Sequence, residues 1–151
     1  MSTLIPETPT SRFLEHLITR EGSSTEVYLD SLGILTVGVG HRVTEEDDLE
    51  LGEVISYPQM SRFLKDDSTK CWQAAVDQAV ELGRIEIPFI EALASVNFQL
   101  GTSWYKIHKR TWKLMMEGEW HKACGEAADS LWFQQTPIRV RDFQEALTNG
   151  R

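Results

Sequence analysis

The segment EGSSTEVYLDSLGILTVGVGH, residues 21–41, is the most informative stretch of this chain. Two apolar runs flank a turn at Ser31-Leu32-Gly33, a pattern that is typical of a β-hairpin. If the hairpin is centred on Gly33, Asp30 lies directly opposite Thr36, with Cβ atoms about 4.5–5.5 Å apart. A carboxylate and a hydroxyl at that distance can hold one water molecule between them.

The second predicted strand has two different faces. Period-2 alternation places Thr36, Gly38 and Gly40 on one face, and the apolar Leu35, Val37 and Val39 on the other. We expect the apolar face to join the core. The first face is nearly bare backbone, as close approach of a ligand requires, although two glycines can also simply permit a bend.

A helix is predicted just before this segment, over about Ser11–Arg20. Thr10 or Ser11 can cap its start, and Gly22 is a natural end. Glu21 then lies at the C-terminal end, where the partial negative charge of the helix favours the neutral form of a carboxyl group. A protonated Glu21, an ionised Asp30 and a hydroxyl that holds water form a glycosidase-like combination.

The rest of the chain reads as helical. Ser56 and Gln59 form a capping pair before a long helix that ends at Gly83. At about 25 residues this helix is long enough to connect two lobes. Further helices are predicted over the ranges 89–100, 103–117, 119–128 and 137–147, the last with Thr136 as its cap and Pro137 at its first position. The order indicates an α+β fold with a cleft between lobes.

Composition and charge argue against a disordered protein, a membrane or secreted protein, and a nucleic-acid-binding protein. The chain has 151 residues, 41% hydrophobic and 25% charged, as expected of a folded globular protein. The sequence offers no apolar run of about 20 residues and no secretory signal, so we expect a protein of the cytoplasm. The net charge is −8, with seven basic and 17 acidic side chains in residues 1–100. This balance argues against a nucleic-acid partner.

No cofactor or metal ion is expected. The acidic loop 45–53 fails as a calcium site, because Leu and Pro occupy ligand positions. The histidines lack ligand spacing, and Val43 stands where a dinucleotide-binding loop needs its third glycine. Cys71 and Cys124 have no paired spacing and are expected to be small apolar side chains. The five tryptophans are expected in the core rather than as sugar platforms.

The pattern Glu21-Gly22-x5-Tyr28-x-Asp30-x2-Gly33-x2-Thr36-x-Gly38-x-Gly40-His41 resembles the catalytic signature of the bacteriophage lysozyme family typified by the T-even phage lysozyme. The resemblance covers about Phe13 to Arg141. It includes the segments 98–101 and 130–139, and Trp120. It implies one lysozyme-like domain, residues 1–151, with an N-terminal lobe of about 11–55, a connecting helix of 56–83 and a helical lobe of 84–151.

The resemblance also implies roles for individual residues. Glu21 matches the general acid, and Asp30 and Thr36 match the residues that position and activate the attacking water. The implied reaction is hydrolysis, with inversion, of the β-1,4 bond between N-acetylmuramic acid and N-acetylglucosamine in peptidoglycan. Arg139 matches an arginine near the acid, and His41 and Asp67 match a structural pair that joins the sheet to the long helix.

Four further positions match residues that contact the sugar chain: Phe98, Gln99, Thr111 and Arg42. Arg42 departs from the apolar residue expected there, so only a backbone role carries over. The acidic net charge also departs from that of the best-known, basic relatives, and long-range attraction to the anionic bacterial wall is expected to be weak.

The implied biological role is host-cell lysis by an endolysin. Such an enzyme is a monomer that acts from the host cytoplasm after a holin-type membrane partner has let it reach the wall. Three alternatives stay open: the same muramidase domain as a delivered toxin or tail-associated enzyme, a non-catalytic peptidoglycan-binding module, and a lytic transglycosylase. The last would need an acid but no group that activates water.

Overall fold

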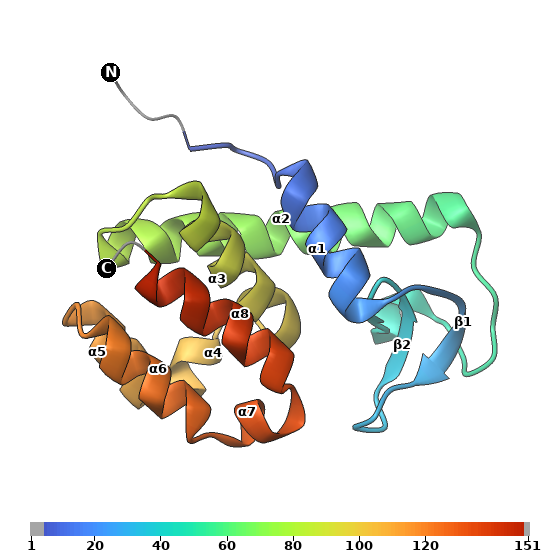
Figure 1. The fold of residues 1–151 in the computed structure, drawn as a ribbon. Coiled ribbons are helices and arrows are strands. Elements are labelled where there is room, and N and C mark those ends of the chain that lie inside the picture. The colour runs from blue at the N-terminus through green and yellow to red at the C-terminus, as the bar shows by residue number, and fades with distance from the viewer. Residues whose placement is uncertain (1–4, 150–151) are drawn as a thin grey trace. The chain divides into compact units, whose positions relative to one another are not determined.

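The computed structural model describes residues 5–149, and the fold is α+β (Figure 1). The described residues form two compact units. Pro9–Lys70 make up the first, which we call the sheet unit. The described parts of Met1–Thr8 and Cys71–Arg151 make up the second, which we call the helical unit. The division falls within the helix that the sequence predicts as the connection.

The sheet unit opens with helix α1, Ser11–Glu21, which has the predicted caps. The Thr10 side chain accepts a hydrogen bond from the Phe13 backbone N–H at 3.1 Å. At the other end, Gly22 has a φ of 71° and its N–H bonds to the carbonyl of Ile18. Glycine suits this position because its φ lies in the left-handed region.

Three antiparallel strands follow, in the order β1 (Ser24–Leu29), β2 (Leu35–Gly38) and β3 (His41–Arg42). The predicted hairpin is present, but its predicted register is wrong by two residues, because Thr36 pairs with Tyr28 and not with Asp30. Gly33, with a φ of 78°, lies one residue past the centre of the loop 30–34. The third strand was not predicted.

The alternation predicted for the second strand also stops early. Gly38 and Gly40 both have positive φ, 63° and 62°, and Gly40 lies in the turn between β2 and β3 rather than on a strand face. Their missing side chains serve internal packing. A Cβ atom on Gly38 would lie 3.1 Å from the Met60 side chain, and one on Gly40 would meet Glu21.

The predicted apolar face of the sheet does form a core. Val27, Val37 and Ile55 are almost completely buried, and the half-buried side chains packed against them are Leu35, Val43, Leu49, Met60 and Phe63. The acidic loop contains a short 3-10 helix, η1, Glu45–Asp47. Beside it the backbone of residues 52–55 hydrogen bonds to that of β1, which covers part of this edge strand.

Helix α2, Tyr57–Leu82, is the predicted long helix. Ser56 caps it by accepting from the Gln59 backbone N–H at 3.2 Å, and Gly83 follows its end with a φ of 75°. The other helices are α3 (Ile87–Leu100), α4 (Trp104–Ile107), α5 (Lys109–Met116), α6 (Trp120–Ala128), α7 (Leu131–Gln135) and α8 (Pro137–Thr148).

Three features of the helical unit differ from the prediction. The helix predicted over 103–117 is interrupted at His108, whose ψ of 56° is not helical. The five-residue α7, which Ser130 caps, was not predicted. Thr136 does not cap α8 with its side chain, because its hydroxyl donates to the Trp132 carbonyl and accepts from Gln99.

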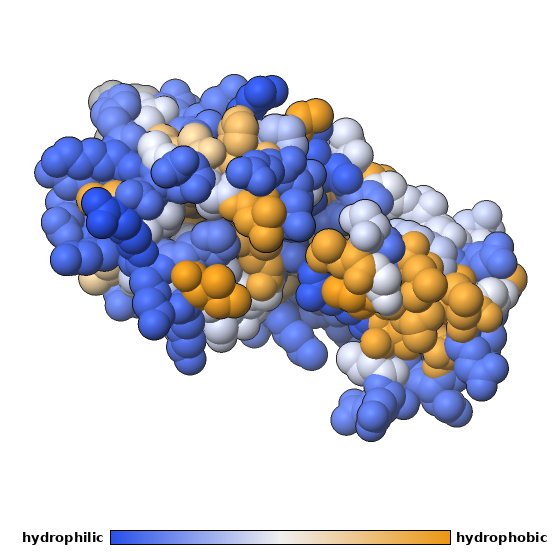
Figure 2. Space-filling view, turned by 90° about the horizontal axis from the view of Figure 1, so that it is seen from below, coloured by the Kyte–Doolittle hydropathy of each residue, from blue (hydrophilic) through white to orange (hydrophobic). Residues whose placement is uncertain are grey.

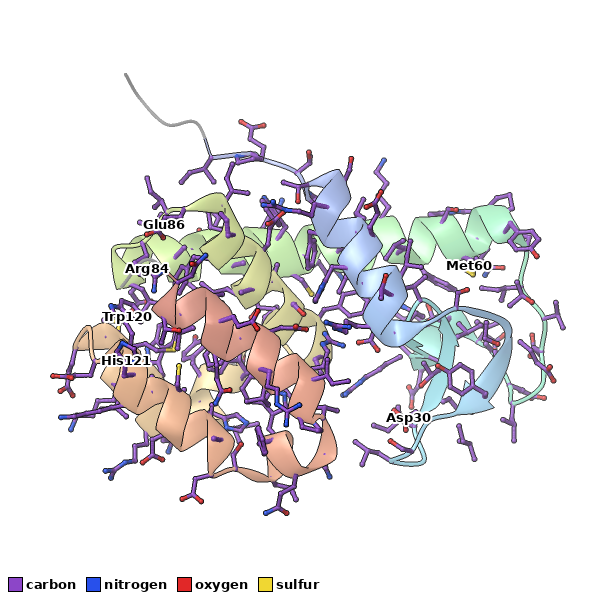
Figure 3. All side chains as sticks on the ribbon, viewed as in Figure 1. Asp30, Met60, Arg84, Glu86, Trp120 and His121 are labelled. Carbon is purple, nitrogen blue, oxygen red and sulfur yellow. The ribbon has the colours of Figure 1, made fainter. Side chains whose placement is uncertain are left out.

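Three of the five tryptophans lie in the core of the helical unit, as predicted, whereas Trp112 and Trp120 are half-buried. Trp72, Trp104 and Trp132 are buried, and edge-to-face contacts join Trp104 to Trp112 and Phe143. The guanidinium of Arg84 lies over the rings of Phe89 and Trp120 and donates to the carbonyls of Ala146 and Leu147 at the end of α8 (Figure 3). Cys71 and Cys124 are free thiols.

Within residues 5–149 there is no helix with the length and apolar character that a membrane crossing requires. The same part of the chain contains no group of three or more metal-ligating side chains that could hold an ion.

Candidate active site

Glu21 is the last residue of α1, and the turn between β2 and β3 fixes the space around its carboxyl group. A Cβ atom built on Gly40 would lie 3.1 Å from Cδ and Oε2 of Glu21. Glycine at position 40 therefore lets the backbone of the turn approach the carboxyl group closely. The side chain of Glu21 is half-buried at this place.

Asp30 begins the loop between β1 and β2 (Figure 3). Its Oδ1 atom accepts hydrogen bonds from the backbone N–H groups of Leu32 and Ile34, both at 2.9 Å. These two bonds fix the orientation of the carboxylate and close the loop. They leave Oδ2 as the oxygen that can accept a proton from a water molecule.

Thr36 lies in the middle of the sheet. Its register partners are Tyr28 on β1 and Arg42 on β3, so the three side chains form one row on the same face. Asp30 follows the end of β1, and its backbone N–H donates to the Ile34 carbonyl at 3.0 Å. The Thr36 side chain is only 4% exposed, and its hydroxyl donates to the Ile34 carbonyl at 2.9 Å.

Tyr28 connects the parts of this site electrostatically. Burial raises the pKa of its phenol, and the negative charges of Glu21 and Asp30 raise it further. Both carboxyl groups therefore act on one hydroxyl, although they come from the end of a helix and from a hairpin loop. Glu21, Asp30, Thr36 and Arg42 all belong to the sheet unit, where Thr36 lies between Tyr28 and Arg42 in the register of the strands.

His41 and Asp67, the expected structural pair, are in contact. The Nδ1 atom of His41 lies 2.6 Å from Asp67 on α2, and its ring stacks on Phe63 at 3.9 Å. Nε2 lies 2.8 Å from Asp47, a contact that the sequence did not predict. Burial lowers the pKa of His41, but the hydrogen bonds and charges of the two aspartates outweigh it, and the pKa is raised overall.

The other predicted residues belong to the helical unit. The Arg139 side chain is 9% exposed and donates to the carbonyl and the hydroxyl of Ser95. Gln99 donates to Thr136 at 2.8 Å and accepts from the Trp132 indole at 2.9 Å. These contacts orient the amide at the end of α3. Two further expected residues are Phe98, which is half-buried, and Thr111, which is buried.

Tyr28 and Asp47 are the residues of this region to which the sequence assigned no role. Tyr28 was part of the motif, and only the register of β1 against β2 shows that it faces Thr36. The signal for Asp47 was its position three residues after Thr44, since the two form a capping box around η1.

An exposed apolar area accompanies the site. Figure 2 shows hydrophobic side chains gathered over the sheet unit, and Leu29, Leu32, Leu51 and Val54 are each more than half exposed. A groove of about 330 Å³ runs between β1 and the loop at Leu51 and Gly52, and Tyr28 contributes to its wall.

Comparison with known proteins supplies the family. Residues 19–141 match the family model described as phage lysozyme. A probable T4-type lysozyme 2 of Dictyostelium discoideum is 30% identical, covering 79% of this chain and 83% of that protein. Probable T4-type lysozyme 1 of the same organism is 28% identical, covering 86% of this chain and 89% of that protein.

A third relative is the pre-baseplate central spike protein Gp5 of Enterobacteria phage T4. It is 26% identical over 95% of this chain, which corresponds to 29% of that longer protein. The family match runs from the end of α1 through the sheet and α2 and over most of the helical unit. The chain therefore belongs to the phage lysozyme family and is a glycosidase of the lysozyme type.

Proposed function

We propose that this enzyme hydrolyses the β-1,4 bond between N-acetylmuramic acid and N-acetylglucosamine in bacterial peptidoglycan, with inversion at the anomeric carbon. Glu21 acts as the general acid, and Asp30 and Thr36 hold and activate the attacking water. The observation that carries the proposal is that the Glu21 carboxyl group lies against the turn that joins β2 to β3, while Asp30 and the buried Thr36 belong to the hairpin of the same sheet.

Glu21 is suited to the role of the acid. It is the last residue of α1, and a carboxyl group can serve as a proton donor to the glycosidic oxygen. Close packing against Gly40 limits the positions of the carboxyl group. Protonation of the glycosidic oxygen makes the departing sugar a good leaving group as the bond breaks.

Asp30 and Thr36 are suited to the role of water holders. With Oδ1 of Asp30 occupied by two backbone N–H groups, Oδ2 can take the proton that the water loses as it attacks. Thr36 donates its own proton to the Ile34 carbonyl, so its oxygen can accept a hydrogen bond from the water. The product is a sugar of inverted configuration.

The variant Glu21→Gln tests the role of the acid. We expect it to keep its fold and to lose at least roughly a hundredfold in the rate of digestion of purified peptidoglycan, the low end for general-acid catalysis. Glu15→Gln is the matched control, because Glu15 is an exposed carboxylate of the same helix. Unchanged digestion by Glu21→Gln would show that Glu21 is not the acid.

Analysis of the products distinguishes hydrolysis from the action of a lytic transglycosylase. Hydrolysis leaves reducing muramic acid ends, whereas transglycosylation leaves anhydro ends. The configuration of the freshly released anomeric carbon, followed by NMR before mutarotation, tests inversion. Binding of peptidoglycan without any cleavage would instead favour the non-catalytic module.

The sugar chain is proposed to contact Phe98, Gln99 and Thr111 of the helical unit and the backbone at Arg42. The amide of Gln99 supports this, because its two hydrogen bonds fix its orientation. Arg139 is proposed to act near the acid, and His41 with Asp67 to keep the sheet attached to α2. No cofactor or metal ion takes part in the proposed reaction.

We propose host lysis as the biological role, by a monomer that reaches the wall through a holin-type membrane partner. The similarity to the spike protein Gp5 favours a second candidate, a tail-associated enzyme. Mass spectrometry of purified phage particles separates the two, since a tail-associated enzyme is retained in the particles and an endolysin is found in the lysate.

A further inference from the structure

The groove beside β1 is an outward continuation of the apolar core of the sheet unit. Val27 on β1 is buried in that core with Ile55. Leu29 is two residues further along the strand, and side chains at this spacing point to the same side. It is 52% exposed, and Leu51 on the opposite wall of the groove is 60% exposed. The apolar surface of the core therefore continues to the solvent here, as the orange area over the sheet unit in Figure 2 shows.

The edge of β1 is paired with the loop 52–55 only as far as Val27. The Val27 N–H donates to the Glu53 carbonyl at 2.8 Å, and its carbonyl accepts from the Gly52 N–H at 2.9 Å. The chain then turns away at Gly52, whose φ is 88°. Backbone groups of alternate residues in an antiparallel strand point to the same edge, so the N–H and carbonyl of Leu29 face this side too. A strand edge of this kind can take up an extended segment as a further strand.

The charges around the groove are almost all negative. Residues 21–61 contain nine aspartate and glutamate side chains, and Arg42 is the single lysine or arginine among them. Glu26 lines the groove, and the exposed Glu50 and Glu53 lie on either side of its opposite wall in the sequence. Among the residues that the structure describes, no lysine or arginine forms an ion pair with these three glutamates. The rim of the groove therefore carries uncompensated negative charge.

This charge distinguishes between the possible occupants of the groove. An anionic glycan or an anionic lipid surface would be repelled by the three carboxylates. A second copy of the chain docked through the same face would bring two acidic rims together, which is unfavourable. A basic segment with apolar side chains avoids both penalties, because it covers the exposed leucines and also neutralises the rim.

We propose that this groove binds an extended, basic polypeptide segment of another protein. Its apolar side chains cover Leu29 and Leu51, and its lysine or arginine side chains pair with Glu26, Glu50 and Glu53. Alternate side chains of an extended segment point to opposite sides, so a sequence that alternates apolar and basic residues fits best. Binding of this segment does not depend on the proposed hydrolysis.

Three synthetic octapeptides test the chemistry of the partner: one alternating lysine with leucine, one lysine with serine, and one glutamate with leucine. Titration of each into the ¹⁵N-labelled full chain is followed by NMR. We expect the lysine–leucine peptide to shift the amide signals of residues 24–29 and 51–54, and the other two to shift them much less. Groove amides that do not respond to the lysine–leucine peptide at millimolar concentration would overturn the inference.

Two variants test the residues of the groove. We expect the dissociation constant of the lysine–leucine peptide to rise by about fivefold in Leu51→Ser, which removes apolar contact, and by about threefold in Glu26→Gln, which removes one charge. Ile138→Ser and Glu81→Gln are the matched controls, since both change exposed side chains of the helical unit. Thermal unfolding checks that the variants are folded. Equal affinities of Leu51→Ser and Ile138→Ser would show that the peptide does not use the groove.

The other occupants have tests of their own. Sedimentation of the chain alone detects a second copy, and a wild-type dimer that Leu51→Ser dissociates would overturn the inference in favour of self-association. Co-sedimentation with phosphatidylglycerol vesicles detects a lipid surface, and vesicle binding that Leu51→Ser abolishes would overturn it in favour of a membrane. We expect neither, because both surfaces are anionic.

Discussion

At the scale of single residues, the conformation of Gly40 decides how closely the backbone approaches the proposed acid. Its φ of 62° lies in the left-handed region, and a Cβ atom would lie 3.1 Å from the Glu21 carboxyl group. Two separate costs follow for any other residue at position 40, backbone strain and displacement of Glu21. The two costs can be measured independently.

The variant Gly40→Ala should lose stability and activity together. We expect a loss of about 1–2 kcal/mol from the left-handed conformation and a lower rate of peptidoglycan digestion, because Glu21 must move. Gly118→Ala is the control, since Gly118 has a φ of 73° and no atom within 4 Å of its Cβ position. Thermal unfolding and digestion rates are the measurements. Equal activities of the two variants would contradict the packing argument.

At the scale of elements, His41 joins three parts of the sheet unit. It lies on β3, and its two ring nitrogens contact Asp47 of η1 and Asp67 of α2. Because each nitrogen faces a carboxylate oxygen, the protonated imidazolium can donate to both. Asp47 also accepts from the backbone N–H of Thr44 at 2.8 Å, so the same carboxylate organises the acidic loop.

This cluster should make the stability of the protein depend on pH. The pKa of His41 is raised in the folded protein, so this histidine contributes to the stability of the fold. Its contribution is complete at pH values below the ordinary pKa of about 6.5 and is lost as the pH rises through the raised pKa. Burial raises the pKa of Asp47, but its hydrogen bonds outweigh burial and the pKa is lowered overall. Asp47 therefore contributes to the stability of the fold at pH values above about 3.9, and this contribution is lost as the pH falls through the lowered pKa.

The variant His41→Asn should therefore be less stable than the wild type by about 2 kcal/mol between about pH 4 and pH 6.5. The difference should shrink at higher pH. Denaturant unfolding at a series of pH values measures it, with His121→Asn, an exposed histidine of α6, as the control (Figure 3). A difference that does not change with pH would exclude the charged pair as its source.

At the scale of the whole molecule, the net charge of −8 opposes attraction to an anionic wall. We expect modest lytic activity whose rate changes by less than about tenfold between ionic strengths of about 0.01 M and 0.15 M. The decrease in turbidity of a suspension of purified walls measures this rate. A steep loss of lysis over that range would show that a local basic surface, and not the net charge, governs the encounter.

The local elements of the fold could be predicted because their signals lie close together in the sequence. Thr10 and Gly22 mark the ends of α1, and Gly83 marks the end of α2. The break at His108 could not be predicted in the same way, because the residues around it have ordinary helical spacing. A helix as short as α7 also has too few residues to show a period.

The register of the hairpin shows where local reasoning fails. The turn residues predicted a hairpin, but its centre depends on how the loop satisfies its hydrogen bonds. Asp30 accepts from two backbone N–H groups, and Gly33 takes the left-handed position, so that the loop is centred on Leu32. This shift of two residues places Tyr28, rather than Asp30, opposite Thr36.

The sequence by itself determined the α+β class, the order of the main elements and the motif that places the chain among the phage lysozymes, because these depend on spacing along the chain. Tertiary structure alone decided which residues contact the residues of the motif. Gly40 lies against Glu21, Tyr28 lies opposite Thr36, and Asp47 contacts His41. The physical reason is that such contacts join residues on different elements, and their geometry depends on register, turn conformation and packing.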